Sequence, residues 1–101
     1  MGYEVELRPE VVEEDLAELP ANIRSRIIRA IEGRLTTEPT RYGVRLRQSL
    51  GGLWKIPVGD YRIVYEIGEK RVTVWAIRHR KDVYGEAERR WPYDSSAGIQ
   101  P

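Results

Sequence analysis

LGGLWKIPVGDYRIVYE, residues 50–66, is the stretch of this sequence that decides the fold. It contains two runs rich in β-branched and aromatic residues, Leu53–Val58 and a second that begins at Tyr61. Such runs are typical of β-strands. Gly59 and Asp60 separate them, and a two-residue type II′ turn prefers glycine in its first place. The stretch therefore predicts an antiparallel β-hairpin.

Counting outward from this turn gives the register of the hairpin: Val58 opposes Tyr61, and Lys55 opposes Val64. Opposed residues share a face of the sheet. One face is apolar and suited to cover by helices. Its residues are Trp54, Ile56, Tyr61, Ile63 and Tyr65. Lys55 and Arg62 are expected to project together from the other, uncovered face.

A third strand over residues 71–78 follows a loop at residues 68–70. A three-residue loop would oppose Arg62 with Ala76 and place Arg78 on the uncovered face, whereas a two-residue loop would invert the faces. We favour three residues because this register buries the tryptophan of the strand. The residues that it turns toward the core are Thr73, Trp75 and Ile77.

The first 40 residues predict one strand and two helices. Residues 3–7 alternate between apolar and charged side chains, and Pro9 then occupies the first position of a helix that ends at Pro20. A second amphipathic helix ends before Pro39. Its apolar stripe consists of Ile23, Ile27, Ile31 and Leu35. Because a single proline separates the helices, we expect an antiparallel helical hairpin.

The complete reading is an α+β fold in the order β-α-α-β-β-β-α. It places an antiparallel sheet under an N-terminal helical hairpin, with a further strand-like segment at residues 44–47 and a short C-terminal helix at residues 80–90. A single domain is expected over residues 1–91. Prolines, serines and a glycine predict a flexible C-terminal tail over residues 92–101.

Composition excludes several classes of protein. The chain has 101 residues and 41% hydrophobic content, enough for one domain. It has no cysteine, which excludes disulfides and thiolate catalysis, and a single histidine, His79, which disfavours a metal site. No cofactor is expected.

No apolar stretch approaches the roughly 20 residues that cross a bilayer, and no signal peptide is visible, so we expect a soluble, cytoplasmic protein without a membrane partner.

Charge is distributed unevenly along the chain. Residues 1–40 hold 5 Arg and 9 Asp or Glu, net −4, whereas residues 41–91 hold 12 Lys or Arg and 6 Asp or Glu, net +6. Such asymmetry favours an anionic partner, most commonly nucleic acid; an evenly solvated basic surface is the alternative.

His79 lacks a motif partner and is expected to be solvated or hydrogen-bonded rather than a general base.

The candidate site follows from the predicted sheet. Lys55, Arg62 and Arg78 share the uncovered face, and Tyr84 begins the last helix within reach of it. The competing interpretation is that exposed cations only keep the sheet soluble and protect its edges.

Further contacts with the anionic partner are expected from exposed basic and aromatic residues. Arg45 and Arg47 extend the cationic track toward phosphates, with alternating charge on an exposed strand as the ordinary explanation. Trp54 and Trp75 fall on the core side and are expected to pack there. Trp91 remains as the candidate for stacking on a nucleobase.

Residues 50–66, together with AIRHRKDVYGEA at residues 76–87, resemble the toxins of the RelE/ParE superfamily. The glycine-containing turn, the aromatic-Lys-Ile step, the GDYRIVYE core and the RHRKDVY segment occur in the same order. RelE-type members cut messenger RNA in the ribosomal decoding site, whereas ParE-type members poison DNA gyrase without nuclease activity. The RHRKDVY segment resembles the RelE branch.

The resemblance implies catalytic roles for particular residues of this chain. Lys55 matches a basic catalytic residue, Arg62 the arginine of the core motif, and Tyr84 the tyrosine near the terminal helix. Arg78 matches a further functional arginine, and Arg80 takes that role if the alignment slips.

One departure from the family pattern concerns Pro57, which stands where many relatives carry a second lysine or arginine. The absence of this cation either weakens cleavage or is compensated by Arg80 or Lys81. The departure motivates one alternative, a degenerate toxin that acts only as a binding module. A ParE-like gyrase inhibitor is the other.

The RelE-type reading implies a ribosome-dependent endoribonuclease of a type II toxin-antitoxin system. Its reaction is attack of the RNA 2′-hydroxyl on the adjacent phosphate without a metal ion. The implied partners are a cognate antitoxin and the ribosome with mRNA in its decoding site. DNA binding is expected only through the antitoxin.

Overall fold

A five-stranded sheet with helices on both faces forms this protein. The computed structural model describes the backbone of residues 2–99 and the side chains of residues 2–91. The strands are β1 (Glu4–Leu7), β2 (Val44–Arg45), β3 (Leu53–Val58), β4 (Tyr61–Ile67) and β5 (Arg71–His79). The α-helices are α1 (Leu16–Glu18), α2 (Ala21–Ala30), α3 (Pro39–Tyr42) and α4 (Val83–Ile99). The π-helical segments η1 (Val11–Asp15) and η2 (Ile31–Leu35) and the 3-10 turn η3 (Gln48–Leu50) complete the fold.

The predicted α+β class and element order are confirmed, but the sheet is mixed rather than antiparallel. The strand order is β1-β5-β4-β3-β2, and β1 runs parallel to β5. The helices that follow β1 carry the chain away from it, so β1 pairs with the last strand in sequence. A pattern within one segment of the sequence does not predict which distant strand that segment pairs with.

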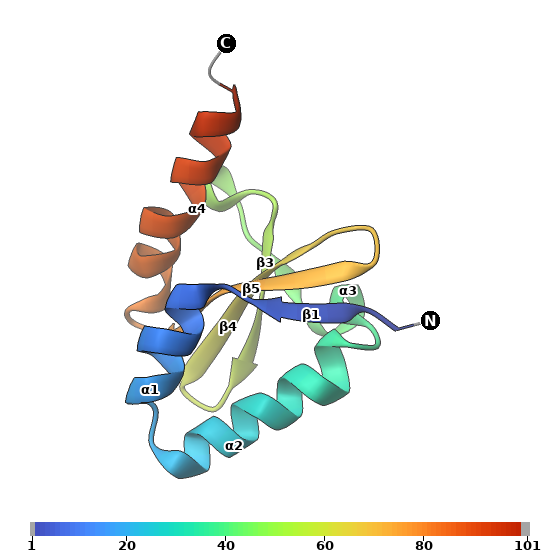
Figure 1. Cartoon of the computed structure of the whole chain (residues 1–101), viewed down its shortest axis with the longest axis vertical. Coiled ribbons are helices and arrows are strands. Elements are labelled where there is room, and N and C mark those ends of the chain that lie inside the picture. Colours follow the sequence, from blue (N-terminus) through green and yellow to red (C-terminus); the bar gives the residue numbers. More distant parts are fainter. Residues whose placement is uncertain (1, 100–101) are drawn as a thin grey trace.

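The helical hairpin forms as predicted. η1 and α1 make one continuous helix, and α2 and η2 make the next. Leu19 has extended backbone angles, as expected for the residue before Pro20, and this residue ends the first helix. Figure 1 shows the sharp bend between α1 and α2, with α2 along the bottom of the molecule and α4 rising to the C-terminal end.

The register of the β3-β4 hairpin is confirmed pair by pair, including Lys55 opposite Val64 and Val58 opposite Tyr61. Gly59 has a φ of +61°, in the left-handed region that the first position of the predicted turn requires. Local turn chemistry was sufficient to give this register.

The predicted register between β4 and β5 is wrong. Arg62 opposes Arg78 rather than Ala76, because the connecting loop is longer than expected and a β-bulge follows Val64. The extra residue at the bulge is Trp75, which packs on the α4 side instead of the hairpin side. Thr73 likewise pairs with Glu66 and lies away from the hairpin side. Arg78 nevertheless shares a face with Arg62, and Ile77 joins the hairpin core as predicted.

Two apolar clusters lie on the two faces of the sheet. The first packs the helical hairpin on residues such as Ile56, Ile63 and Tyr65. The second packs Val83 and Ala87 of α4 on the opposite face, together with Leu50, Leu53, Val64, Trp75 and Ala76. The face predicted to be uncovered is therefore partly covered by α4, which leaves only its basic margin accessible.

The last helix is longer than predicted. α4 continues to Ile99, past the expected end at Arg90. Residues 100 and 101 of the predicted tail lie outside the described residues, and the flexibility of residues 92–101 stays a prediction. Within residues 2–99, no helix is long and apolar enough to cross a membrane.

Candidate functional site

A lysine and a tyrosine from distant parts of the chain meet at the centre of the candidate site. Lys55 on β3 donates a hydrogen bond from Nζ to Oη of Tyr84, in the first turn of α4, over 2.6 Å. The Lys55 ammonium also lies 5.1 Å from the centroid of the Tyr84 ring. Both side chains are half-buried. The two residues that the sequence placed within reach of one another are thus in direct contact.

The start of α4 holds Tyr84 in this position. The preceding residue, Val83, is completely buried in the second apolar cluster, and Ala87 is buried one turn later. The chain turns into the helix through a backbone hydrogen bond from Asp82 N to the carbonyl of His79 at the end of β5. Packing of α4 therefore determines where the phenol lies.

Arg62 lies on the neighbouring strand and on the same face as Lys55. Its register position is diagonal to Lys55, a separation of about 7–8 Å between backbones. Its Nη1 donates to the carbonyl oxygens of Gly59 and Tyr61, over 3.0 and 2.9 Å. Among the described residues, neither Arg62 nor Lys55 forms an ion pair with a carboxylate. Both positive charges therefore remain available to an anion.

The prediction that Arg78 is a free cation of this site requires correction. Its Nε donates to Asp15 Oδ1 over 2.6 Å, and its other nitrogens lie 3.6 and 3.7 Å from Glu14 and Glu86. Burial lowers the pKa of Arg78, but the hydrogen bond and the charge of Asp15 outweigh it, so the pKa is raised. The charge of Arg78 is already neutralised within the protein.

Arg80 and Lys81 are exposed beside the site, just beyond β5. Arg80 Nε lies 3.8 Å from Asp60 Oδ1, a loose contact between two exposed side chains. His79 accepts a hydrogen bond from Lys81 N at Nδ1, over 3.2 Å, and its ring meets Tyr61 edge-on at 5.7 Å. The hydrogen bond agrees with the prediction of a solvated or hydrogen-bonded His79, and the prediction that it is not a general base stays a prediction.

The residues predicted to make outer RNA contacts differ in how accessible they are. Arg45 and Arg47 are exposed, and the guanidinium of Arg45 lies 5.6 Å from the ring centroid of Trp54. Trp91 does not lie free for a nucleobase, because it packs edge-on against Trp75 with centroids 5.2 Å apart. Val83, Ala87 and Trp91 recur every four residues, a spacing that predicts the buried stripe of a longer helix.

An ion cluster around the buried Asp15 was not predicted from the sequence; it also contains Arg78, Glu86 and Arg90. Asp15 is 1% exposed, and it accepts from Ile77 N over 2.8 Å and from Arg90 Nη1 over 2.9 Å. Only the i, i+4 spacing of Glu86 and Arg90 was visible in the sequence. Within the described part of the chain, no group of His, Cys, Asp and Glu side chains is arranged to hold a metal ion.

Comparison with known proteins gives a consistent result. Residues 5–84 match the family described as "ParE toxin of type II toxin-antitoxin system, parDE". Toxin RelG of Mycobacterium tuberculosis is 38% identical over 72 residues, which are 69% of this chain and 83% of that protein. Toxin RelE of the same organism is 39% identical over 72 residues, covering 69% of this chain and 74% of that protein.

Solved structures share the architecture described above. A toxin-antitoxin complex, RelBE2 of Mycobacterium tuberculosis, contains a chain that is similar at a TM-score of 0.74 and 30% identity. The similarity covers 79% of this chain and 100% of that one. A mutant of Escherichia coli toxin RelE in the free state has a TM-score of 0.67 at 19% identity, over 88% of this chain and 97% of that one.

Proposed function

Because this chain belongs to the RelE/ParE superfamily of type II toxin-antitoxin toxins, we propose that it is a ribosome-dependent endoribonuclease that cleaves translated mRNA. The observation that carries the proposal is the 2.6 Å hydrogen bond between Lys55 and Tyr84 beside the unpaired charge of Arg62. A gyrase poison would need no such proton-transferring pair.

The proposed reaction uses the nucleophile that RNA itself provides. The 2′-oxygen forms a bond to the neighbouring phosphorus, the bond from phosphorus to the 5′-oxygen breaks, and the 5′-oxygen takes up a proton. The products are a 2′,3′-cyclic phosphate and a 5′-hydroxyl. Lys55 and Tyr84 orient the 2′-hydroxyl and move the proton, and the planar guanidinium of Arg62 binds the scissile phosphate.

Charge that develops on the leaving oxygen requires a further cation. Of the two arginines that the sequence offered, Arg80 is the better candidate, because Arg78 is neutralised by Asp15 and Glu86. Arg80 is exposed and has only the loose contact with Asp60. Lys81 follows it and contributes to RNA binding together with Arg45 and Arg47.

The ribosome supplies what this shallow site lacks. The site lies on the margin of a sheet, and nothing among the described residues encloses a nucleotide on all sides. Precise placement of the reacting atoms accounts for a large part of many catalysed rates. An mRNA held by the ribosome would already have its scissile phosphate in place, so cleavage is expected only during translation.

A cognate antitoxin is the second proposed partner. The similar chain from Mycobacterium tuberculosis was solved in a toxin-antitoxin complex, and the one from Pyrococcus horikoshii in a RelE-RelB complex. We expect the antitoxin to cover the basic margin and to carry any DNA-binding domain. The proposed place of action is the cytoplasm, where translated mRNA is found.

Gyrase inhibition is the second candidate function, because the matched family is described by its ParE toxin. Pro57 also favours a protein without cleavage activity, since this exposed residue of β3 adds no cation to the site. Mapping of RNA 5′ ends on a translated and an untranslated copy of one transcript, alongside a supercoiling assay, separates the functions. Cuts confined to the translated copy support the nuclease; loss of supercoiling without cuts supports the gyrase poison.

Replacement of single site residues tests the assigned chemistry. Lys55→Met and Arg62→Ala should each lower the cleavage rate by roughly 100- to 10,000-fold, the range for losing a proton-transferring or charge-stabilising group. Lys70→Met, in the exposed loop before β5, is the matched control and should cleave normally. Circular dichroism should show an unchanged fold in all three. Normal cleavage by Arg62→Ala would remove that arginine from the mechanism.

A further inference from the structure

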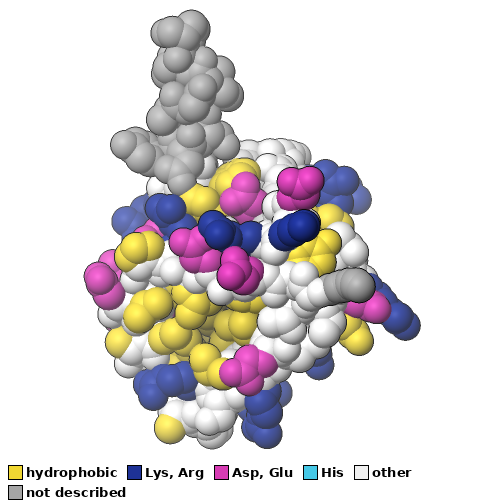
Figure 2. Space-filling view, turned by 45° about the vertical axis from the view of Figure 1, so that its right-hand side comes forward, with side chains coloured by type: hydrophobic (Ala, Val, Ile, Leu, Met, Phe, Trp, Pro, Cys, Tyr) yellow, Lys and Arg dark blue, Asp and Glu magenta, His cyan; other side chains and the backbone are white. Residues whose placement is uncertain are grey.

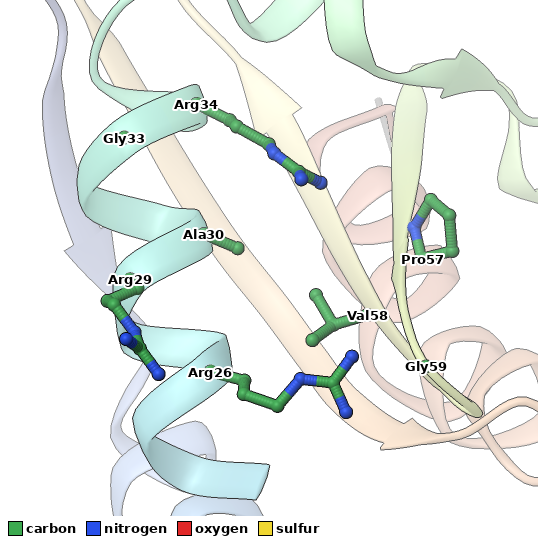
Figure 3. Close-up of a pocket in the computed structure, with 8 residues that line it drawn as sticks. All are labelled: Arg26, Arg29, Ala30, Gly33, Arg34, Pro57, Val58 and Gly59. Carbon is green, nitrogen blue, oxygen red and sulfur yellow. The ribbon is translucent and has the colours of Figure 1, made fainter.

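A groove with a volume of about 590 Å³ lies between α2 and the outer edge of β3, and three arginines line it. Figure 3 shows Arg26 and Arg34 reaching from the α2–η2 helix toward β3, while Arg29 lies along the helix. Val58 and Gly59 form the opposite wall. We call this feature the arginine groove.

The charges of the arginine groove are not neutralised by the protein. Within the part of the chain whose side chains are described, Arg26, Arg29 and Arg34 form no ion pair with a carboxylate. All three are exposed. Arg78 and Arg90, in contrast, are held by Asp15 and Glu86. The fold thus pairs its inner arginines and leaves those of the groove to an external anion.

The walls of the groove favour a nucleic-acid strand over a peptide. Ala30 and Val58 are buried, so neither of these apolar side chains is open to an amphipathic helix, and Pro57 is the exposed apolar residue of the lining. Pro57 lacks the backbone N–H that an added β-strand would need. Arg34 lies 5.8 Å from the ring centroid of Tyr42, which is 47% exposed. Arginines beside an accessible aromatic ring are typical of single-stranded nucleic-acid binding.

The groove and the candidate site meet at Gly59 of the β3-β4 turn. A Cβ atom at Gly59 would lie 3.3 Å from Arg26 Nη1, and the carbonyl of Gly59 accepts the hydrogen bond from Arg62. Arg26 therefore lies beside the same turn residue to which Arg62 is hydrogen-bonded. A strand whose phosphate binds Arg62 has a positively charged path from there into the groove.

We propose that the arginine groove binds the phosphates of the mRNA that flank the scissile bond, with Tyr42 as a surface on which a base stacks. This inference rests on the proposed function, because it describes a longer path for the same substrate. Each phosphate contact releases bound counterions, so it contributes about 0.7 to the slope of log affinity against log salt concentration for a single strand.

The test measures binding of fluorescent oligouridine RNA, twelve nucleotides long, at several salt concentrations. Arg26→Ala/Arg34→Ala should reduce the magnitude of the salt slope by about 1.4, the amount for two phosphate contacts. The control is Arg41→Ala/Lys70→Ala, which removes the same charge from exposed positions outside the groove. The salt slope of this control should differ from that of the unaltered protein by less than about 0.7, the contribution of one phosphate contact. Trinucleotides should bind the groove variant and the unaltered protein equally.

Two results would overturn the inference. The first is an equal salt slope of RNA binding for the groove variant and the control variant. The second is a groove variant that binds RNA like the unaltered protein but no longer binds a polyglutamate peptide. The second would make the groove a peptide site. Ribosome-dependent cleavage, measured on the same proteins, distinguishes the two proposals. RNA binding through the groove without cleavage by any protein would refute the proposed function and leave the groove as an RNA-binding surface only. Cleavage with equal slopes would keep the proposed function and refute this inference.

Discussion

Tyr65 illustrates at the residue scale how one buried polar group is satisfied. Its side chain is completely buried, and its hydroxyl donates to the carbonyl of Pro39 over 2.7 Å. A Cβ atom at Gly43 would lie only 1.9 Å from that hydroxyl, so only glycine leaves room for it. Burial raises the pKa of Tyr65 from 10.0 to about 12.

The raised pKa of Tyr65 predicts how stability depends on pH. The folded state holds the phenolic proton more tightly than the unfolded state, so this contribution is fully present below about pH 10 and is lost as pH rises through about 12. Tyr65→Phe should cost about 1 kcal/mol at pH 7, from the lost hydrogen bond. That difference in unfolding free energy should shrink between pH 10 and 12. Urea unfolding across this range measures it, and a constant difference would contradict the assignment.

At the scale of elements, the ion cluster around the buried Asp15 joins three parts of the fold. The carboxylate of Asp15, at the end of η1, accepts hydrogen bonds from Ile77 N and Arg78 Nε of β5 and from Arg90 Nη1 of α4. Arg90 also donates to the carbonyl of Trp75, over 2.8 Å. The cluster therefore anchors α4, whose first turn carries Tyr84 to Lys55.

Removal of the central charge should loosen α4. Asp15→Asn leaves the partly buried Arg78 and Arg90 without their main counter-charge, and we expect a loss of about 3–5 kcal/mol in unfolding free energy. Amide hydrogen exchange in α4 should accelerate more than in β4. Asp60→Asn, at an exposed carboxylate near Arg80, is the control and should cost under about 1 kcal/mol. Unchanged exchange in α4 of Asp15→Asn would show that apolar packing alone holds this helix.

At the scale of the whole molecule, one sheet separates two apolar clusters and carries charge of both signs outside. Adjacent residues of β4 face different clusters: Ile63 and Tyr65 pack under the helical hairpin, and Val64 packs under α4. Figure 2 shows basic and acidic side chains interspersed over one face, with hydrophobic ones gathered among them. On this face neither sign of charge forms a continuous patch.

The shared strands predict a single unfolding transition. Leu35→Ala, in the hairpin cluster, removes a completely buried side chain and should cost about 2–5 kcal/mol. In a Trp54→Phe background, the remaining fluorescence of Trp75 and Trp91 reports the other cluster, and it should shift together with circular dichroism to lower urea concentration. Separate midpoints for the two signals would instead indicate that the clusters unfold independently.

Features with a local cause were predictable from the sequence. The β3-β4 register follows from Gly59 and Asp60, and Pro20 and Pro39 delimit the helices, because turn geometry and proline chemistry act within a few residues. The meeting of Lys55 with Tyr84 was predicted only as proximity. The site assignments beyond this contact remain proposals for the experiments above.

The amino-acid sequence by itself determined the α+β order, the hairpin that carries Lys55 and Arg62, and the face they share. Only the tertiary structure decided that β1 runs parallel to β5, that a bulge turns Trp75 toward α4, and that Asp15 neutralises Arg78. The physical reason is range: periodicity and turn chemistry are properties of neighbouring residues, whereas a buried charge takes its partners from whichever elements the packed core brings beside it.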